Sequence, residues 1–263
     1  MIDAHNHLHQ LPDPDLALSQ ALDAGVTKMI INGTSEQDWH QIANLCKKHN
    51  STPPATNTKL VPAFGLHPWQ TPNRSPSWLT TLEQLLLANP DAHLGECGLD
   101  RWKKPFNLPD QITCLHQQTE LATRLNRPLT IHCLQAWGPL LELLESLPPI
   151  PPFLLHAYSG SPQLISRFTK LGSYFSFNGY FLHKRKSAAR QTFQQIPLDR
   201  LLLETDAPAM LPPPNFITHP LPDHQNHPAN LPSFLAPLAK LRRMSPEALA
   251  SQLNSNFNRL NIR

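Results

Sequence analysis

Eight short apolar runs, separated by segments in which apolar residues recur at the i, i+3, i+4 spacing of helices, predict an α/β fold for this chain. Strands that alternate with helices pair in parallel and are joined by crossover helices. Eight such units in 263 residues match the size of a (β/α)8 TIM barrel, so we predict a single domain over residues 1–263. An open, doubly wound sheet is the competing fold, but HLHQLPDPDL replaces the Gly-rich phosphate turn that usually follows its first strand.

The predicted strands are, in order, residues 1–7, 26–34, 60–68, 92–100, 128–133, 153–160, 173–180 and 201–208. Helical spacing is clearest in the segments 75–90 and 109–127, and the first of these begins with Ser75 and Pro76, residues suited to the N-cap and the first helical position. Many of the 29 prolines stiffen the connections between elements. The Pro-rich stretch from Ala207 to Asn230 is long for a barrel loop, and loops of this length are usually functional or mobile.

The composition indicates a globular protein of the cytoplasm. Apolar residues make up 40% of the chain and charged residues 16%, which separates it from disordered proteins. The net charge of +3 permits a nucleic-acid partner without arguing for one, because phosphate binding needs a local basic patch. The four cysteines form no CxxC pair, which favours a reducing compartment. Neither a signal peptide nor a membrane-spanning run is expected.

Titratable side chains recur at the ends of the predicted strands. The full set is His5, His7, His67, Glu96, Asp100, His132, His156, Glu204 and Asp206. Strand ends of one polarity converge at a single mouth of a (β/α)8 barrel, so these side chains should meet at the C-terminal ends of the strands. Burying so many titratable groups together is costly unless something pairs them. Divalent cations would do so, and the pattern therefore predicts a metal site.

The types of ligand narrow the choice of metal. Histidines and carboxylates without thiolates suit Zn, Mn, Ni or Fe, and imidazole argues against Ca or Mg as the sole occupant. Cys97 and Cys133 each follow a candidate ligand and should point away from it, toward the helices. Two metals need a bridging group, and Glu96 offers two oxygens midway around the set. We expect two divalent ions or more, with Zn, Mn, Mg, Ni and Fe not distinguished.

The motifs DAHNH, GLHPW, GECGLD, IHC, HAYSG, LLLETDAP and PANLP occur in the order found in TatD-type metal-dependent deoxyribonucleases, a branch of the amidohydrolase-like barrels. The chain resembles this family from Asp3 to the closing NFNRL. The resemblance implies a barrel fold and hydrolysis of phosphodiester bonds, typically removal of nucleotides from the 3′ end of DNA. The metal ligands that it implies are His5, His7, Glu96, His132, His156 and Asp206.

The same resemblance suggests catalytic roles for Asp206, Glu96 and Glu204. Asp206 would ligate metal and accept a proton from the attacking water, and Glu204 would hold a ligand imidazole from behind. Strand alternation alone also places Glu204 on the face of Asp206, so that role stays open. The expected substrate contacts are His67, Arg101, Trp102 and Asn230. Trp102 could stack on a base. For His67, a purely structural role at the end of its strand is the alternative.

Three departures from the family pattern flank the site. IHCLQAW lacks the usual Arg, His227 stands where a Glu is expected, and AMLPPPNFITHPLPDHQN lacks the usual Arg-bearing segment. The candidate cations near the mouth include Lys103, Lys104 and the run 183–186. A barrel that hydrolyses a small ester, lactone, amide or phosphoester is the alternative function, although its relatives often carry a carboxylated lysine where this chain has Glu96. A non-catalytic metal-binding scaffold is a third reading. We expect DNA as the partner and a monomer or weak oligomer.

Overall fold

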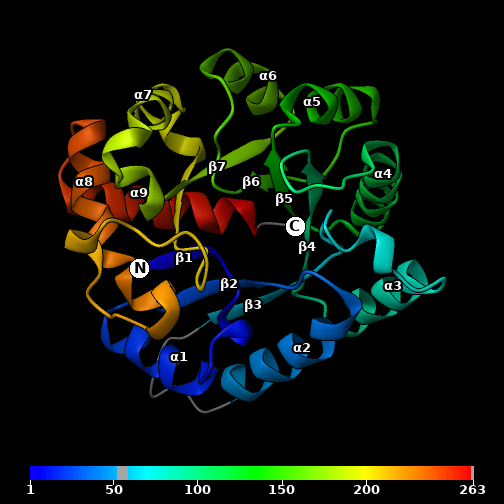
Figure 1. Cartoon of the computed structure of the whole chain (residues 1–263), viewed down its shortest axis with the longest axis horizontal. Helices are drawn as coiled ribbons and strands as arrows, with labels where there is room; N and C mark the ends of the chain where they lie inside the picture. Colours follow the sequence, from blue (N-terminus) through cyan, green and yellow to red (C-terminus); the bar gives the residue numbers. More distant parts are fainter. Residues whose placement is uncertain (52–58, 262–263) are drawn as a thin grey trace.

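The computed structural model describes residues 1–51 and 59–261, which form an eight-stranded parallel sheet curled into a nearly closed barrel and surrounded by helices (Figure 1). The strands follow one another around the barrel in sequence order, from β1 to β8. Each strand is parallel to the next, as the crossover helices require. The predicted (β/α)8 barrel is therefore confirmed.

The strands are β1 (Ile2–Asn6), β2 (Lys28–Asn32), β3 (Lys59–Phe64), β4 (His93–Asp100), β5 (Leu129–Leu134), β6 (Phe153–Leu155), β7 (Ser173–Asn178) and β8 (Leu201–Glu204). The helices are α1 (Pro14–Asp23), α2 (Glu36–Asn50), α3 (Trp78–Ala88), α4 (Leu108–Leu125), α5 (Trp137–Ser146), α6 (Ile165–Lys170), α7 (Ser187–Gln195), α8 (Pro232–Arg242) and α9 (Pro246–Leu260). Among the described residues, no helix combines the length and the hydropathy needed to cross a membrane.

Several helices begin where the sequence supplies a cap. Asp13 accepts a hydrogen bond from the backbone N–H of Leu16 at the start of α1, and Asn107 accepts one from Asp110 at the start of α4. The helix α3 differs from the prediction, because it begins at Trp78 rather than next to Ser75. The backbone N–H and the hydroxyl of Ser75 both donate to the Glu36 carboxylate, at 2.8 and 2.5 Å, which holds Ser75 outside the helix.

The barrel interior is apolar at the N-terminal end of the strands. Its side chains form a separate buried cluster of Ile2, Ala4, Ile30, Val61, Ala63, Leu154, Tyr174, Leu202, Phe257 and Leu260. Phe257 and Leu260 belong to α9, the red helix that crosses the barrel in Figure 1. The helix α9 therefore closes this end, and the polar strand ends are left at the other.

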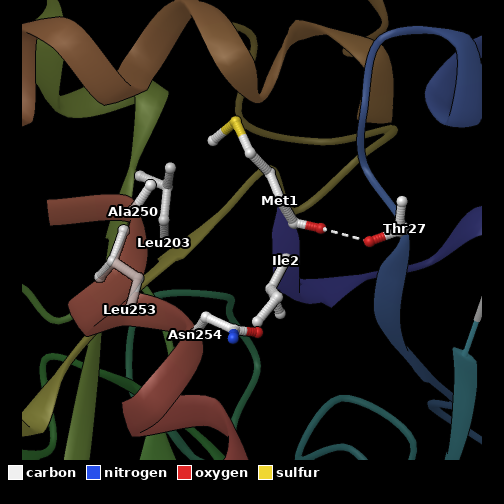
Figure 2. A pocket seen from close by; sticks show the side chains of 7 residues that line it. All are labelled: Met1, Ile2, Thr27, Leu203, Ala250, Leu253 and Asn254. Carbon is white, nitrogen blue, oxygen red and sulfur yellow. Dashed lines mark hydrogen bonds between the residues drawn. The ribbon is translucent and has the colours of Figure 1, made fainter. Parts of the chain in front are cut away.

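A cavity of about 150 Å³ lies at the closed end, between α9 and the start of β1 (Figure 2). Its lining consists of Met1, Ile2, Thr27, Leu203, Ala250, Leu253 and Asn254. None of these seven side chains is titratable, and Asn254 and Thr27 are the polar ones among them. The N-terminal face of a (β/α)8 barrel serves stability rather than chemistry, so this cavity belongs to the packing of the fold.

The sheet closes between β8 and β1 through the Asp3 carboxylate. The backbone N–H and hydroxyl of Thr205 donate to it at 2.9 and 2.5 Å, and the next residue, Asp206, donates its N–H to the His5 carbonyl at 2.9 Å. Burial raises the pKa of Asp3 to about 7, against the opposing effect of the Thr205 hydrogen bonds. Asp3 thus fixes the register that places Asp206 beside His5.

Asn256 of α9 ties the closing helix to the strand β8. Its amide nitrogen donates to the carbonyls of Leu198 and Leu201 at 2.8 and 2.7 Å. We expect Asn256→Ala to lower the free energy of unfolding by about 2 kcal/mol, because buried carbonyls lose their donors. Urea denaturation measures the change. The exposed neighbour Ser255→Ala is the control, and equal stabilities of the two variants would contradict the role of Asn256.

Candidate metal centre

The six predicted metal ligands meet at the C-terminal end of the barrel, although up to 201 positions separate them along the chain, from His5 to Asp206. His67, His156 and Asp206 lie one to three residues beyond the ends of β3, β6 and β8, where the chain leaves the sheet. Five of the six ligands are buried, and the His132 side chain is 14% exposed. The convergence expected from the sequence is what the structure shows.

Gly98 lets β4 approach β5 closely at the level of His132. The two residues are in register, and a Cβ built on Gly98, where φ is +144°, would lie 1.9 Å from the His132 carbonyl oxygen. No side chain fits there. The register places Glu96 and Asp100, two residues to either side of Gly98, at the two nitrogens of the His132 ring.

One group of candidate ligands consists of His5 Nε2, His7 Nε2, Asp206 Oδ1 and Glu96 Oε2. The two nitrogens are 3.3 Å apart, and each is 3.3 Å from the Asp206 oxygen. Glu96 Oε2 lies 3.5 Å from His5 Nε2 and 3.4 Å from His7 Nε2. Ligand atoms around a tetrahedral ion with bonds of about 2.0–2.1 Å are about 3.4 Å apart. This donor set therefore fits a divalent cation.

The second group uses the other oxygen of Glu96. Oε1 lies 3.1 Å from His132 Nδ1 and 2.9 Å from His156 Nε2, and these two nitrogens are 3.2 Å apart. Glu96 thus presents one carboxylate oxygen to each group. This is the position of a bridging ligand, and it supports the expectation that Glu96 joins two cations.

Hydrogen bonds behind two of the histidines decide which ring nitrogen carries the proton. His7 Nδ1 lies 2.7 Å from the carbonyl oxygen of Asn32, and His132 Nε2 lies 2.9 Å from Asp100 Oδ2. Both partners accept, so these outer nitrogens carry the proton in the neutral ring. The inner nitrogens then direct lone pairs into the cluster, as metal ligation requires.

Glu204 lies behind His156. Its Oε1 is 3.6 Å from His156 Nδ1, and Asn178 Nδ2 and the Ser176 hydroxyl donate to the same carboxylate. The side chain is fully buried and faces the outer side of the imidazole rather than the cation position. At 3.6 Å the contact is an ion pair rather than a hydrogen bond, and Glu204 thus lies on the side of the ring from which it is expected to hold the ligand histidine.

His67 differs from the other histidines of the mouth. Its Nδ1 accepts the backbone N–H of Trp69 at 3.1 Å, so Nε2 carries the proton in the neutral ring. That Nε2 lies 3.5 Å from Glu96 Oε1. Burial lowers the pKa of His67 to about 3, which keeps the ring neutral. His67 is therefore a hydrogen-bond donor at the edge of the cluster, as a phosphate contact would be.

The cluster without metal is held together by charge. Burial raises the pKa of Glu96 and Asp206, but the surrounding histidines outweigh it and hold both pKa values well below their usual range. Burial lowers the pKa of His7, but Asp206 and Glu96 outweigh it and raise the pKa to about 9. Any cation that binds here must therefore displace protons.

Asn230, an expected substrate contact, lies in the long loop after β8. The side chain is fully buried, and its Oδ1 accepts the backbone N–H groups of Thr218 and His219, both at 2.8 Å. Its Nδ2 donates to Asn226 Oδ1 at 3.0 Å. The amide thus braces the long loop after β8, and its contact with a substrate stays a prediction.

Arg101 and Trp102 begin the loop after β4, at the edge of the mouth. Trp102 is 58% exposed, and its backbone N–H donates to Asp100 Oδ1 at 2.7 Å. The guanidinium carbon of Arg101 lies 6.0 Å from the centre of the Phe106 ring. Both side chains are free to meet a substrate, and Asp100 ties their loop to His132.

Two residues of the mouth have partners that the sequence does not predict. Asp100 ends a predicted strand, but its contact with His132 follows from the register of β4 on β5, which no local pattern shows. Trp69 lies within GLHPW, and its ring centre is 4.8 Å from that of His67 and 6.3 Å from that of His132. The available signal in the sequence is its position two residues after His67, an expected substrate contact.

Other features of the sequence lie away from the cluster. Cys97 and Cys133 are buried in the hydrophobic core, and burial raises the pKa of both thiols. His227, which stands in place of the expected Glu, is also buried, and its Nδ1 accepts the backbone N–H of Ala229. These residues belong to the packing of the fold.

Comparison with known proteins decides the family of this barrel. The family model described as "TatD related DNase" matches residues 2–261. The chain belongs to the TatD family. The 3′-5′ ssDNA/RNA exonuclease TatD of Erwinia billingiae is 31% identical over 250 residues, which cover 94% of this chain and 92% of that protein.

Solved structures agree with this assignment. The TatD homologue YJJV from Escherichia coli K12 is 30% identical, with a TM-score of 0.86 over 100% of this chain and 98% of that one. A TatD-family hydrolase from Entamoeba histolytica has a TM-score of 0.85 at 21% identity, covering 99% and 97% of the two chains, and shows the fold alone. Several amidohydrolases named for small-molecule substrates share only the fold, at 11–16% identity and TM-scores of 0.51–0.60.

Asp100→Asn should weaken metal binding on the His132 side of the centre. The backbone N–H groups of Trp102 and Lys103 hold Oδ1, so the new amide nitrogen would face His132 and force its proton onto Nδ1. We expect the dissociation constant for zinc on the His132 side to rise about 10- to 100-fold. Calorimetric titration of the metal-free protein measures it.

The exposed Asp199→Asn is the matched control for this substitution, and it should bind zinc as the unmodified protein does. An unchanged zinc affinity in Asp100→Asn would show that Asp100 does not set the proton position on His132.

Metal affinity should increase with pH. The raised pKa of His7, about 9 against an ordinary 6.5, means that below pH 9 the incoming cation must displace a proton. Affinity should therefore rise about tenfold per pH unit for each displaced proton, and the contribution of His7 should level off above about pH 9. Calorimetric titrations in buffers of different ionisation enthalpy count the released protons. A metal affinity that does not change with pH would contradict the raised pKa of His7.

Proposed function

We propose that this protein is a metal-dependent nuclease that hydrolyses phosphodiester bonds and shortens single-stranded DNA from its 3′ end, with two divalent cations held at the mouth of the barrel. The observation that carries the proposal is the position of Glu96, whose two carboxylate oxygens face two separate groups of ligand atoms. The names of the relatives support the substrate and the direction.

His5, His7 and Asp206 would hold one cation, His132 and His156 the other, and Glu96 both. The donor set of imidazole and carboxylate suits Zn, Mn, Ni or Fe, with Mg possible only beside another of these ions. When bound, the cations would neutralise charge on the phosphate and lower the pKa of a water molecule. That is the chemistry that hydrolysis of a stable diester needs.

The residues of this chain supply the remaining steps. Asp206 stays ionised because the pKa of its carboxyl is held well below its usual range, so it can accept a proton from the attacking water. His67 Nε2–H can donate to a phosphate oxygen, because its other nitrogen is already occupied by the Trp69 N–H. Arg101 and Trp102 would then meet the phosphate backbone and a base beyond the mouth.

Hydrolysis of a small ester, lactone, amide or phosphoester is the alternative. The amidohydrolases with such names share only the fold with this chain, whereas the TatD relatives match it at about 30% identity over nearly its whole length. A location in the cytoplasm and a monomeric or weakly oligomeric state stay predictions.

The test loads the purified protein with Zn, Mn or Mg and adds 5′-labelled single-stranded DNA. We expect a ladder of products shortened from the 3′ end, which a chelator abolishes. Glu96→Ala should lose both the bound metal and at least about 10³-fold of the cleavage rate, because both ligand groups lose an oxygen.

Metal analysis and gel electrophoresis provide the two measurements. Glu145→Ala, which removes an exposed carboxylate of α5, is the control and should leave both unchanged. Intact DNA after incubation with protein that holds two equivalents of metal, together with turnover of small esters, would overturn the proposal in favour of the alternative.

A further inference from the structure

The exposed aromatic side chains of this protein gather at the mouth. Five large apolar residues in the described part of the chain are strongly exposed: Leu16, Trp69, Leu87, Trp102 and Phe106. The three aromatic ones all lie on the loops that follow β3 and β4, next to the candidate metal centre. Exposed apolar surface concentrated beside a site indicates a binding surface.

Trp69 is the member of this group that reaches the centre. Its backbone N–H holds His67, and its ring, 39% exposed, lies edge-on to the ring of His67 with the two centres 4.8 Å apart. The indole is therefore fixed against the donor histidine and still presents surface to solvent.

Lys103 brings a positive charge to the same ring from the neighbouring loop. Its Nζ lies 4.2 Å from the centre of the Trp69 ring. Its backbone N–H donates to Asp100 Oδ1 at 2.9 Å, and the other oxygen of Asp100 contacts His132. The backbone of Lys103 and the backbone of Trp69 are thus tied to two different histidines of the mouth, Lys103 through Asp100 to His132 and Trp69 directly to His67.

An aromatic face and an ammonium side by side match the two parts of one nucleotide. A base stacks on an indole, and a phosphate pairs with an ammonium. The contact of an exposed ammonium with an aromatic ring is weak. A base can therefore displace the Lys103 ammonium from the Trp69 ring, and the ammonium can pair with a phosphate of the same nucleotide.

We propose that Trp69 and Lys103 bind the 3′-terminal nucleotide of a single strand, with its base on the indole and a phosphate on the ammonium. This inference rests on the proposed function, because it takes nucleic acid as the ligand. Paired bases are stacked inside a duplex and cannot lie on the indole, so the pair selects an unpaired 3′ end.

The experiment measures equilibrium binding rather than cleavage. Fluorescein-labelled oligonucleotides carry phosphorothioate linkages at the 3′ end to block hydrolysis, and end either in a normal nucleotide or in an abasic one. An oligonucleotide with the abasic residue in its middle is the substrate control. Fluorescence anisotropy with the metal-loaded full chain gives each dissociation constant.

We expect the unmodified protein to bind the normal end about 5- to 100-fold more tightly than the abasic end. Trp69→Ala should bind the two ends alike, and Trp69→Phe, which keeps a ring, should retain most of the preference. Loss of the preference in Trp69→Ala together with its retention in Trp69→Phe separates stacking from a general loss of structure.

Lys103→Met should weaken binding of both ends by the same factor and reduce the slope of log affinity against log salt by about 0.7, the value for one phosphate of a single strand. Lys170→Met, which removes an exposed ammonium at the C-terminal end of α6, is the matched control and should change neither quantity. The inference is overturned if Trp69→Ala still binds the normal 3′ end more tightly than the abasic one, or if the unmodified protein binds the two ends alike. Binding with the expected preference but no cleavage of unblocked DNA would overturn the proposed function alone.

Discussion

The buried carboxylate of Glu96 is the constraint on which the rest of the structure depends. An ionised carboxylate with 2% exposure is stable only where positive charge surrounds it. The barrel provides that charge by bringing His5, His7, His132 and His156 within 3.5 Å of its two oxygens. The same crowding leaves ligand atoms at the spacing of a coordination sphere, so what stabilises the carboxylate also prepares the site for cations.

The acceptors behind the histidines make this arrangement specific. The Asn32 carbonyl and the Asp100 carboxylate lie at hydrogen-bond distance from the outer nitrogens of His7 and His132, and the Glu204 carboxylate lies 3.6 Å from the outer nitrogen of His156. Such acceptors orient the ring and direct its free lone pair inward. His67 has the opposite hydrogen bond and the opposite role, because it accepts at its outer nitrogen and so points a proton inward. The hydrogen bond at the outer ring nitrogen therefore decides whether a histidine of the mouth can ligate a metal or donate a proton.

The residues that stabilise the barrel and the residues of the candidate metal centre lie at opposite ends of its axis. At one end α9 packs Phe257 and Leu260 against the first residues of the strands. Between β8 and β1 the Asp3 carboxylate fixes the register of closure. At the other end the loops that present Trp69 and Lys103 are anchored on residues of the metal centre itself, so the surface that would meet a substrate keeps a fixed relation to the reacting groups.

The sequence by itself determined the eight alternating units, the set of histidines and carboxylates at the strand ends, and the family, because apolar periodicity and motif order are local properties of the chain. Only the tertiary structure decided which partner each side chain has. Glu96 lies between two ligand groups, Asp100 contacts His132, and Asn230 braces a loop. These contacts depend on strand register and on loops that meet across the barrel. Register joins residues far apart in the chain, and no local pattern encodes it.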